Sequence, residues 1–364
     1  MKKTGKIDPS ALKVMKGIVM PPPVNENAAR KFLEKKRRGV DVNQITNDII
    51  NGNKTALGSA ITLIESVHPK HSEISEAIIE KCLPFSGNSI RIGITGVPGV
   101  GKSTFIESLG MYLTSLGHKL AVLAIDPSSQ QSGGSILGDK TRMELLSASE
   151  SAFIRPTPSG NTLGGVARKT RETIILCEAA GFDIIIIETV GVGQSETTVH
   201  SMVDFFLLLM LAGAGDELQG IKRGIMELTD TIVINKADGE NVKKAELAKR
   251  NYENALHLFP PHDSGWYPRV LLASGLKNSG IDNVWKTILE YVSLTKKNNF
   301  WNLNRNHQAK YRLHESIQDF LKNNFYHHPD IKNIINYYEG QVMSGSTSPF
   351  LAARQLLNLY FKKT

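Results

Sequence analysis

The chain has 364 residues, of which 41% are hydrophobic, and a formal net charge of +8, which suits one large α/β domain with helical additions or two modest domains. Two cysteines far apart in sequence, Cys82 and Cys177, exclude a disulfide framework and a CxxC metal or redox motif, so we expect small buried thiols in a reducing compartment. The apolar run over 205–212 is far too short to cross a bilayer, and the basic first residues lack the composition of a signal or transit peptide, so we expect a cytoplasmic protein with no membrane partner.

The first part of the chain is predicted to be helical. Residues 24–82 show helical periodicity without strand-like runs, after a break at Pro21-Pro22-Pro23. The basic run Lys35-Lys36-Arg37-Arg38 is not interleaved with stacking aromatic residues, so it favours a solvated helix end over a nucleic-acid patch. We assign residues 1–85 to an N-terminal helical segment.

A glycine-rich loop follows the first predicted strand. It reads Gly96-Val97-Pro98-Gly99-Val100-Gly101-Lys102-Ser103, and it lies between an apolar run over 89–95 and a helical pattern over 104–116. Strand, GxxxxGKS loop and helix in this order are the context of a phosphate-binding P-loop, in which backbone N–H groups and the helix N-terminus attract an anion. We expect Lys102 to reach the outer phosphates and the Ser103 hydroxyl to hold Mg²⁺. A glycine turn that only links strand to helix is disfavoured, because motif and context agree.

Further apolar runs predict buried strands that alternate with helical stretches. These runs cover residues 119–125, 183–188, 205–211, 231–234 and 269–272. The alternation predicts an α/β fold of the P-loop NTPase type over 86–296, with a mostly parallel sheet flanked by helices. From about Gly280 the pattern becomes helical, with amphipathic segments over 285–294 and 311–325, and we assign residues 297–364 to a C-terminal helical region.

Acidic residues near the ends of the predicted strands are candidates for a metal site. Asp126 ends the second strand and Glu188 ends the third. In a P-loop protein, an acidic residue at such a place usually binds magnesium, directly or through water. Asp139, in the glycine-rich run Ser132–Arg142, is a further candidate, and a surface loop with capping aspartates is the alternative for Asp126 and Asp139.

Two more stretches resemble nucleotide-sensing loops. The Gly191 N–H group could sense a γ-phosphate. Val192 follows it, where Ras-like enzymes have a glutamine that orients the attacking water. This difference predicts slow intrinsic hydrolysis, with another group or a partner completing the site. Gln194 lies close by in the sequence. In the next glycine-bracketed stretch, Lys222 or Arg223 could supply positive charge to the transferred phosphate, although helix-surface charges or partner contacts are favoured.

The tetrapeptide Asn235-Lys236-Ala237-Asp238 follows the strand predicted over 231–234. A carboxylate at Asp238 can accept hydrogen bonds from both N1–H and N2–H of guanine, whereas adenine offers an acceptor at N1 and has no 2-amino group. Such a site rejects the wrong base because buried polar groups would remain unpaired. The NKxD sequence downstream of a P-loop therefore predicts guanine recognition, with a helix N-cap at Asp238 as the alternative.

These motifs together resemble the methylmalonyl-CoA mutase-associated GTPases, the MeaB/ArgK/MMAA group of P-loop GTPases. The resemblance extends over about residues 46–339, and the run 133–143 looks specific to the group. The matching motifs are Gly96–Ser103, Asp126–Ser129, Ser132–Arg142, Glu188–Glu196, Asp216–Gly224 and Asn235–Asp238.

The resemblance implies a GTP-hydrolysing chaperone that gates adenosylcobalamin loading and protects or reactivates methylmalonyl-CoA mutase or a related cobalamin-dependent mutase. It also implies a homodimer formed through the C-terminal helices. By the same resemblance, Asp126, Asp139 and Glu188 would surround the magnesium ion and the attacking water, and Lys222 would lie in a third switch. Ser274-Gly275-Leu276 would touch the guanine, although Ala273-Ser274-Gly275 stands here in place of the group's usual Ser-Ala-like element.

Two alternative functions fit the sequence less well. A metallochaperone-type GTPase would need a Cys/His cluster near the switches, and none is visible in the sequence. A small-molecule kinase or transport ATPase is opposed by the NKxD sequence. The residues assigned to catalysis are Lys102, Asp139, Glu188 and Lys222, and those assigned to the metal are Ser103, Asp126, Asp139 and Glu188. Those assigned to GTP or GDP are Gly96 to Thr104, Asn235, Lys236, Asp238, Ser274, Gly275 and Leu276.

Overall fold

The computed structural model describes residues 40–66, 68–126, 142–158, 163–189, 195–213 and 223–361. The chain divides into two compact units, Met1–Asp41 and Val42–Thr364, and every helix and strand of the described residues lies in the second unit. The helices α2 (Val42–Ile50), α3 (Lys54–Glu65) and α4 (Pro69–Cys82), which precede the sheet, therefore belong to the same compact unit as the sheet itself.

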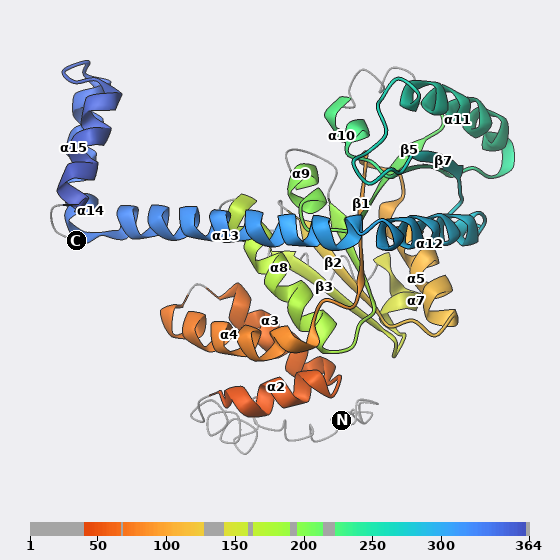
Figure 1. Cartoon of the computed structure of the whole chain (residues 1–364), viewed down its shortest axis with the longest axis horizontal. Coiled ribbons are helices and arrows are strands. Elements are labelled where there is room, and N and C mark those ends of the chain that lie inside the picture. The colour runs from red at the N-terminus through yellow and green to blue at the C-terminus, as the bar shows by residue number, and fades with distance from the viewer. Residues whose placement is uncertain are drawn as a thin grey trace, which may run out of the picture. The chain divides into compact units, whose positions relative to one another are not determined.

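A seven-stranded sheet forms the centre of the second unit (Figure 1), and all its strand pairs are parallel. Its strand order is β3-β2-β4-β1-β5-β6-β7. The strands are β1 (Ile90–Gly96), β2 (Leu120–Asp126), β3 (Ala152–Pro158), β4 (Ile184–Thr189), β5 (Phe205–Leu211), β6 (Thr231–Asn235) and β7 (Arg269–Leu272). The predicted α/β fold is confirmed, and six strands lie within a residue of where the apolar runs predicted them.

Strand β3 was not predicted from the sequence. It contains Arg155, Pro156 and Pro158, which is a poor pattern for a buried strand. In the structure β3 is an edge strand that pairs only with β2 among the described strands. A proline lacks a backbone N–H, so it is tolerated where one side of a strand has no partner.

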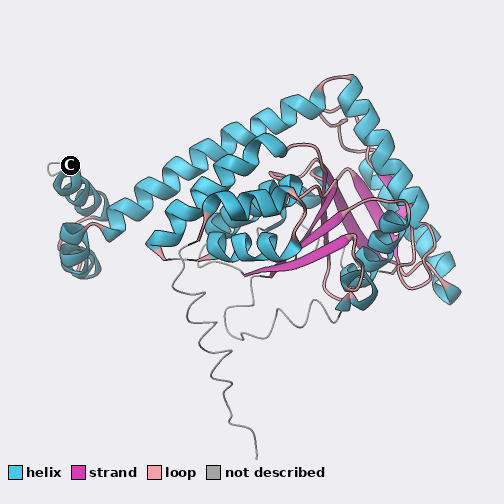
Figure 2. Cartoon of the chain, turned by 90° about the horizontal axis from the view of Figure 1, so that it is seen from below, coloured by secondary structure: helices cyan, strands magenta, loops and turns pink. Residues whose placement is uncertain are grey.

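Helices cover both faces of the sheet (Figure 2). On one face, α5 and α12 pack on apolar side chains of β1, β4 and β5 through residues such as Phe105 and Ile288. On the other face, α8 and the α3–α4 pair pack on β2 and β4 through residues such as Leu57 and Ile174, and α11 packs against β6. The helices are α2 (Val42–Ile50), α3 (Lys54–Glu65), α4 (Pro69–Cys82), η1 (Leu83–Phe85), α5 (Lys102–Ser115), α7 (Glu144–Ser147), α8 (Leu163–Ala179), α9 (Ser195–His200), α10 (Arg223–Glu227), η2 (Gly239–Asn241), α11 (Val242–Leu256), α12 (Ile281–Lys297), α13 (Phe300–His327), α14 (Pro329–Met343) and α15 (Pro349–Phe361).

The long helix α13 is joined to the sheet by a buried ion pair. Arg305 donates from Nε and Nη2 to the two carboxylate oxygens of Asp204, at 2.8 and 2.7 Å, and from Nη2 to the Ser89 carbonyl at 2.6 Å. The Asp204 carboxylate also accepts from the Arg91 backbone N–H at 2.8 Å. This network links the first turns of α13 to the residues that begin β1 and β5.

Both cysteine side chains are buried and free, as predicted. Burial raises the pKa of Cys82 to about 11, and it also raises the pKa of Cys177. Within the described part of the chain, no helix is both long and apolar enough to cross a membrane.

Candidate nucleotide-binding and hydrolysis site

The glycine loop between β1 and α5 passes very close to the neighbouring strands. A Cβ atom at Gly96 would lie 2.5 Å from the Leu209 carbonyl oxygen on β5, a distance that backbone atoms cannot accommodate without a shift. Gly101, which precedes α5, has φ +89°, and a Cβ there would lie 3.1 Å from Nδ2 of Asn235. Both positions therefore require glycine, one for space and the other also for a left-handed backbone.

Lys102 is the first residue of α5, and its ammonium group folds back over the loop. Nζ donates to the Gly96 carbonyl at 2.9 Å and lies 3.4 Å from the Val97 carbonyl. Burial lowers the pKa of Lys102, and the carboxylates of Glu188 and Glu196 offset part of this effect. The loop thus holds a positive charge beside its own backbone, where an anionic phosphate would lie.

A hydroxyl and a carboxylate meet at the carboxyl edge of the sheet. Ser103 Oγ lies 3.4 Å from Oε1 of Glu188, and the buried hydroxyls of Thr95 and Thr189 are joined at 2.8 Å where β1 and β4 end. Hard oxygen donors of this kind suit Mg²⁺. Asp126 is the last residue of β2, and the register that pairs Ile125 with Thr189 brings it to the same edge.

A cavity of about 420 Å³ opens beside these groups. Arg142, the last residue of the glycine-rich run noted in the sequence, is one of its lining residues and was not assigned to the site beforehand. The cavity is lined by Pro98, Gly99, Gly101, Lys102, Ser103, Thr104, Ala124, Ile125, Arg142, Glu188 and Thr189. Its volume lies in the range of ligand pockets, which is roughly 300–1,000 Å³.

The NKxD residues Asn235 and Lys236 make hydrogen bonds to the backbone of the P-loop. Asn235, 2% exposed, donates from Nδ2 to the Val100 carbonyl at 2.8 Å and accepts from the Gly275 N–H at 3.2 Å. Lys236 donates from Nζ to the Gly99 carbonyl at 2.9 Å. These bonds tie the end of β6 to the P-loop, so the NKxD segment and the P-loop form one site.

The Asp238 carboxylate is oriented by the segment that follows β7. Ser274 Oγ donates to Oδ2 of Asp238 and accepts from the Lys277 N–H at 3.1 Å. The Asp238 side chain makes no capping hydrogen bond to η2, so the alternative role as a helix N-cap has no support in its contacts. A Cβ at Gly275 would lie 2.9 Å from Cα of Phe105, so the segment packs directly on α5. Leu276 is exposed.

Some predicted residues fall outside the described part of the chain. These are Asp139, Gly191, Gln194 and Lys222. Asp126 is described only by its place in β2. Their roles therefore stay predictions.

The fold and the site together define a P-loop GTPase: a parallel sheet with a GxxxxGKS loop between β1 and α5, joined to an NKxD segment after β6. The chain belongs to the family described as "Methylmalonyl Co-A mutase-associated GTPase MeaB", whose model matches residues 57–330. It is accordingly a GTP hydrolase that binds GTP and GDP.

Individual relatives agree with this membership. "GTPase ArgK" of Escherichia coli is 45% identical over 305 residues, which cover 84% of this chain and 92% of that protein. "Methylmalonic aciduria type A homolog, mitochondrial" of Mus musculus is 42% identical over 337 residues, covering 90% of this chain and 81% of the mouse protein. A crystal structure titled "LAO/AO transport system kinase" matches with a TM-score of 0.71 and 37% identity, covering 90% of this chain and all of the other. The predicted family is confirmed.

Proposed function

We propose that this GTPase is a magnesium-dependent switch that gates adenosylcobalamin loading into methylmalonyl-CoA mutase, or a related cobalamin-dependent mutase, and protects or reactivates that enzyme. The observation that carries the proposal is the family match over 57–330, because the family's description names the mutase. The name of the mouse relative, which refers to methylmalonic aciduria, supports the same partner enzyme. We propose a cytoplasmic location, whereas the mouse relative is named as mitochondrial.

The hydrolytic roles rest on the charges around the P-loop. Lys102 would neutralise the outer phosphates, and the backbone N–H groups of the loop would donate hydrogen bonds to them. The Ser103 hydroxyl and the Glu188 carboxylate would hold Mg²⁺, with Asp126 and Asp139 around it. Magnesium supplies positive charge that offsets the charge developing on the transferred phosphoryl group. Lys222 is proposed to act from a third switch.

Guanine would be read by Asp238 while Ser274 holds the carboxylate in position, and Asn235 would keep the reading segment in register with the P-loop. The loss of the γ-phosphate on hydrolysis would then change the affinity for the mutase, as in other nucleotide-dependent switches.

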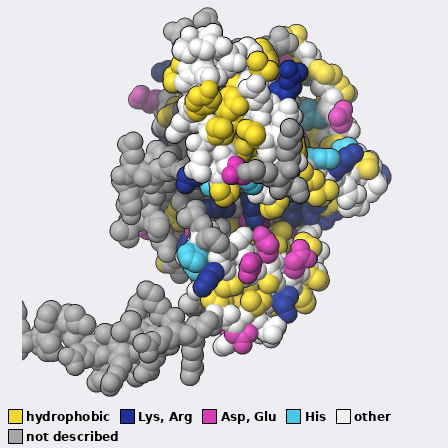
Figure 3. Space-filling view, turned by 90° about the vertical axis from the view of Figure 1, so that its left-hand side faces the viewer, with side chains coloured by type: hydrophobic (Ala, Val, Ile, Leu, Met, Phe, Trp, Pro, Cys, Tyr) yellow, Lys and Arg dark blue, Asp and Glu magenta, His cyan; other side chains and the backbone are white. Residues whose placement is uncertain are grey.

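A homodimer formed through the C-terminal helices is part of the proposal. Figure 3, which faces the end of the molecule where α14 and α15 lie, shows hydrophobic side chains gathered on this surface. Phe350 is 87% exposed and Met343 is 83% exposed, and Phe361 and Tyr337 of the same two helices are also exposed. Exposed apolar side chains that gather on one surface mark protein interaction sites. Analytical ultracentrifugation of the full chain and of Phe350→Ser tests this point, because a monomeric wild-type protein would contradict it.

The proposed function is tested by GTP turnover with and without purified methylmalonyl-CoA mutase. We expect the mutase to change the turnover rate, ATP to be cleaved far more slowly than GTP, and Lys102→Ala to abolish turnover in both conditions. Capture of the mutase should differ between protein loaded with a non-hydrolysable GTP analogue and protein loaded with GDP. Mutase that neither alters turnover nor is captured in either nucleotide state would contradict the proposed partner.

A small-molecule kinase is the second candidate, because the similar solved structure is titled a transport system kinase. Incubation with γ-labelled GTP and basic amino acids distinguishes the two functions. Label that appears only in inorganic phosphate supports the switch, whereas label on an amino acid supports the kinase.

A further inference from the structure

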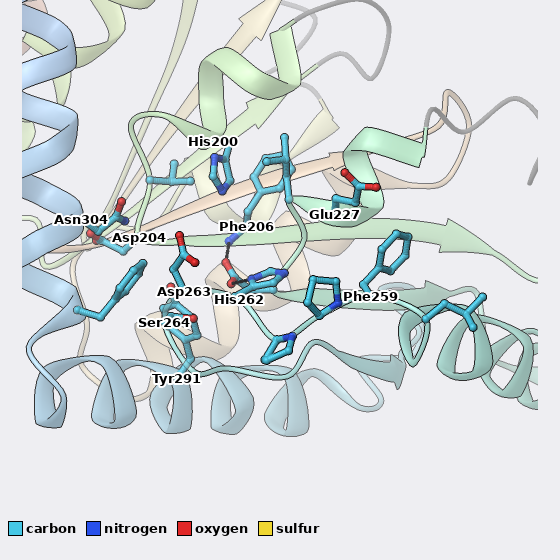
Figure 4. A pocket seen from close by; sticks show the side chains of 17 residues that line it. His200, Asp204, Phe206, Glu227, Phe259, His262, Asp263, Ser264, Tyr291 and Asn304 are labelled. Carbon is cyan, nitrogen blue, oxygen red and sulfur yellow. Dashed lines mark hydrogen bonds and ion pairs between the residues drawn. The ribbon is translucent and has the colours of Figure 1, made fainter.

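A second cavity, of about 510 Å³, lies at the edge of the sheet opposite the P-loop (Figure 4). Asp204 and Asp230, which directly precede β5 and β6, contribute to its wall, whereas the nucleotide residues lie where the parallel strands end. The seven residues of β5 separate the two edges by about 20 Å, at roughly 3.3 Å per residue. The cavity is therefore distinct from the nucleotide site.

The charged groups around this cavity are mostly acidic. Among the described residues, four carboxylates and two histidines line it and no lysine or arginine does; the titratable lining residues are Asp204, Glu227, Asp230, Asp263, His200 and His262. Burial is the main cause of a lowered pKa of His200, so its imidazole is neutral at pH 7. Figure 4 shows His200 facing the cavity from one side and Asp263 from the other. Asp204 is already paired with Arg305, so Asp230 and Asp263 supply the negative charge that would attract a cation.

Two carboxylates of this lining are deeply buried: Asp204, which is paired with Arg305, and Asp230, with a side chain that is only 7% exposed. Oδ2 of Asp230 accepts from the Phe206 N–H at 2.8 Å, and its Oδ1 lies 3.3 Å from Nδ1 of His262. Burying a carboxylate is costly unless a positive charge lies beside it. His262 supplies such a charge only when it is protonated, and a cation in the cavity would supply it otherwise, in a place where water screens charges poorly.

The rest of the wall is apolar and aromatic. Phe259, Tyr291 and Phe300 line the cavity together with Pro260 and Pro261. Aromatic faces attract cations, and flat apolar walls favour a ligand with an apolar body. Within the described residues, no group of three or more His, Cys, Asp and Glu side chains could hold a metal ion, so the lining is suited to an organic cation.

We propose that this cavity binds an organic cation with an apolar body, either a small amine or amidine or the arginine side chain of a protein partner, and that its occupancy is coupled to the bound nucleotide. The coupling part has a structural basis in α9. This helix ends at His200 in the cavity wall and begins at Ser195, six residues beyond Thr189 at the nucleotide edge. A Cβ at Gly93 would lie 3.0 Å from Val199, so α9 also packs tightly on β1, the strand that leads into the P-loop.

Titration calorimetry with benzamidine as the probe tests the site in the full chain loaded with GDP. Benzamide, which has the same shape without the charge, is the matched ligand control. We expect benzamidine to bind at least about ten-fold more tightly than benzamide. Removing one exposed carboxylate, by Asp263→Asn or Glu227→Gln, should weaken benzamidine binding about five-fold, because an exposed charge contributes modestly. Glu246→Gln, an exposed acidic residue on α11 outside the lining, should leave binding unchanged.

Two further arms complete the experiment. The first arm measures the affinity of acetyl-arginine amide, with the uncharged acetyl-citrulline amide as its control. Binding tighter than that of benzamidine would assign the site to the arginine of a protein partner. Weaker binding would assign it to a small organic cation. Benzamidine affinity should also differ about five-fold between the GDP state and the GTP-analogue state, and nucleotide affinity should shift by the same factor, since linkage is reciprocal. Equal affinity for benzamidine and benzamide, or no effect of both carboxylate variants, would overturn the cation site. Equal affinity in the two nucleotide states would overturn the coupling.

Discussion

The replacement of Asp238 by asparagine should convert the base preference of this GTPase from guanine to xanthine. The carboxylate of Asp238 is held by Ser274 Oγ and is half-buried, so in the proposed site it would face the base in a fixed orientation. Asparagine has nearly the same shape but offers one acceptor and one donor, so its N–H₂ would face the 2-amino group of guanine. In xanthine, a carbonyl at C2 replaces that amino group and can accept from the asparagine.

The expected magnitude follows from one hydrogen bond that guanine loses and one that is weakened. A hydrogen bond to a charged group contributes about 1.5–3 kcal/mol and one between neutral groups about 0.5–1.5 kcal/mol, so the total loss is about 2–4 kcal/mol and the GDP dissociation constant should rise roughly 30- to 1,000-fold. Titration calorimetry with GDP and with xanthosine diphosphate, on the wild type and the variant, measures both changes. The matched control is Glu240→Gln, an exposed acidic residue two positions away, which should leave both affinities unchanged.

The reasoning would be refuted by either of two results. One is a Asp238→Asn protein that binds GDP within about ten-fold of the wild type, because Asp238 would then not contact the base. The other is a protein that loses GDP without gaining xanthosine diphosphate, because the residue would then act on the fold of the site rather than on the base.

Three further predictions concern stability and are measured by urea denaturation. Gly96→Ala places a Cβ 2.5 Å from the Leu209 carbonyl and should lower the free energy of unfolding by about 1–3 kcal/mol. Arg305→Ala leaves the buried carboxylate of Asp204 without its cation and should lower it by about 3–5 kcal/mol. His200 has a folded-state pKa below the usual 6.5, so the unfolded chain binds its proton more tightly, and stability from this group is present above pH 6.5 and declines as the pH falls through that value. His200→Gln should remove this part of the decline.

Matched variants control these measurements. Gly224→Ala introduces a methyl group with no atom within 4 Å and should leave stability within about 0.5 kcal/mol of the wild type. Arg269→Ala breaks an ion pair with Glu290 in which both partners are largely exposed, and it should cost less than about 1 kcal/mol. A loss no larger than these controls in Gly96→Ala or Arg305→Ala, or an unchanged pH profile in His200→Gln, contradicts the corresponding prediction.

Much of the nucleotide site could be predicted from the sequence because its elements are contiguous. The GxxxxGKS loop, the apolar strand before it and the helix after it lie within 28 residues, from 89 to 116, and parallel strands buried on both faces appear as continuous apolar runs. The NKxD segment directly follows β6 for the same reason. The predictions of guanine recognition and of family membership therefore depended on local sequence patterns alone.

Other features depended on the tertiary structure, because they join residues that are distant along the chain. Strand order brings Asn235 to the Val100 carbonyl, 135 positions away, and edge position explains why β3 tolerates Pro156. The second cavity combines the starts of two strands, a loop before β7 and residues of α12 and α13, none of which carries a recognisable motif. A local pattern reports how a segment is buried, whereas a site built from several segments exists only once packing has brought them together.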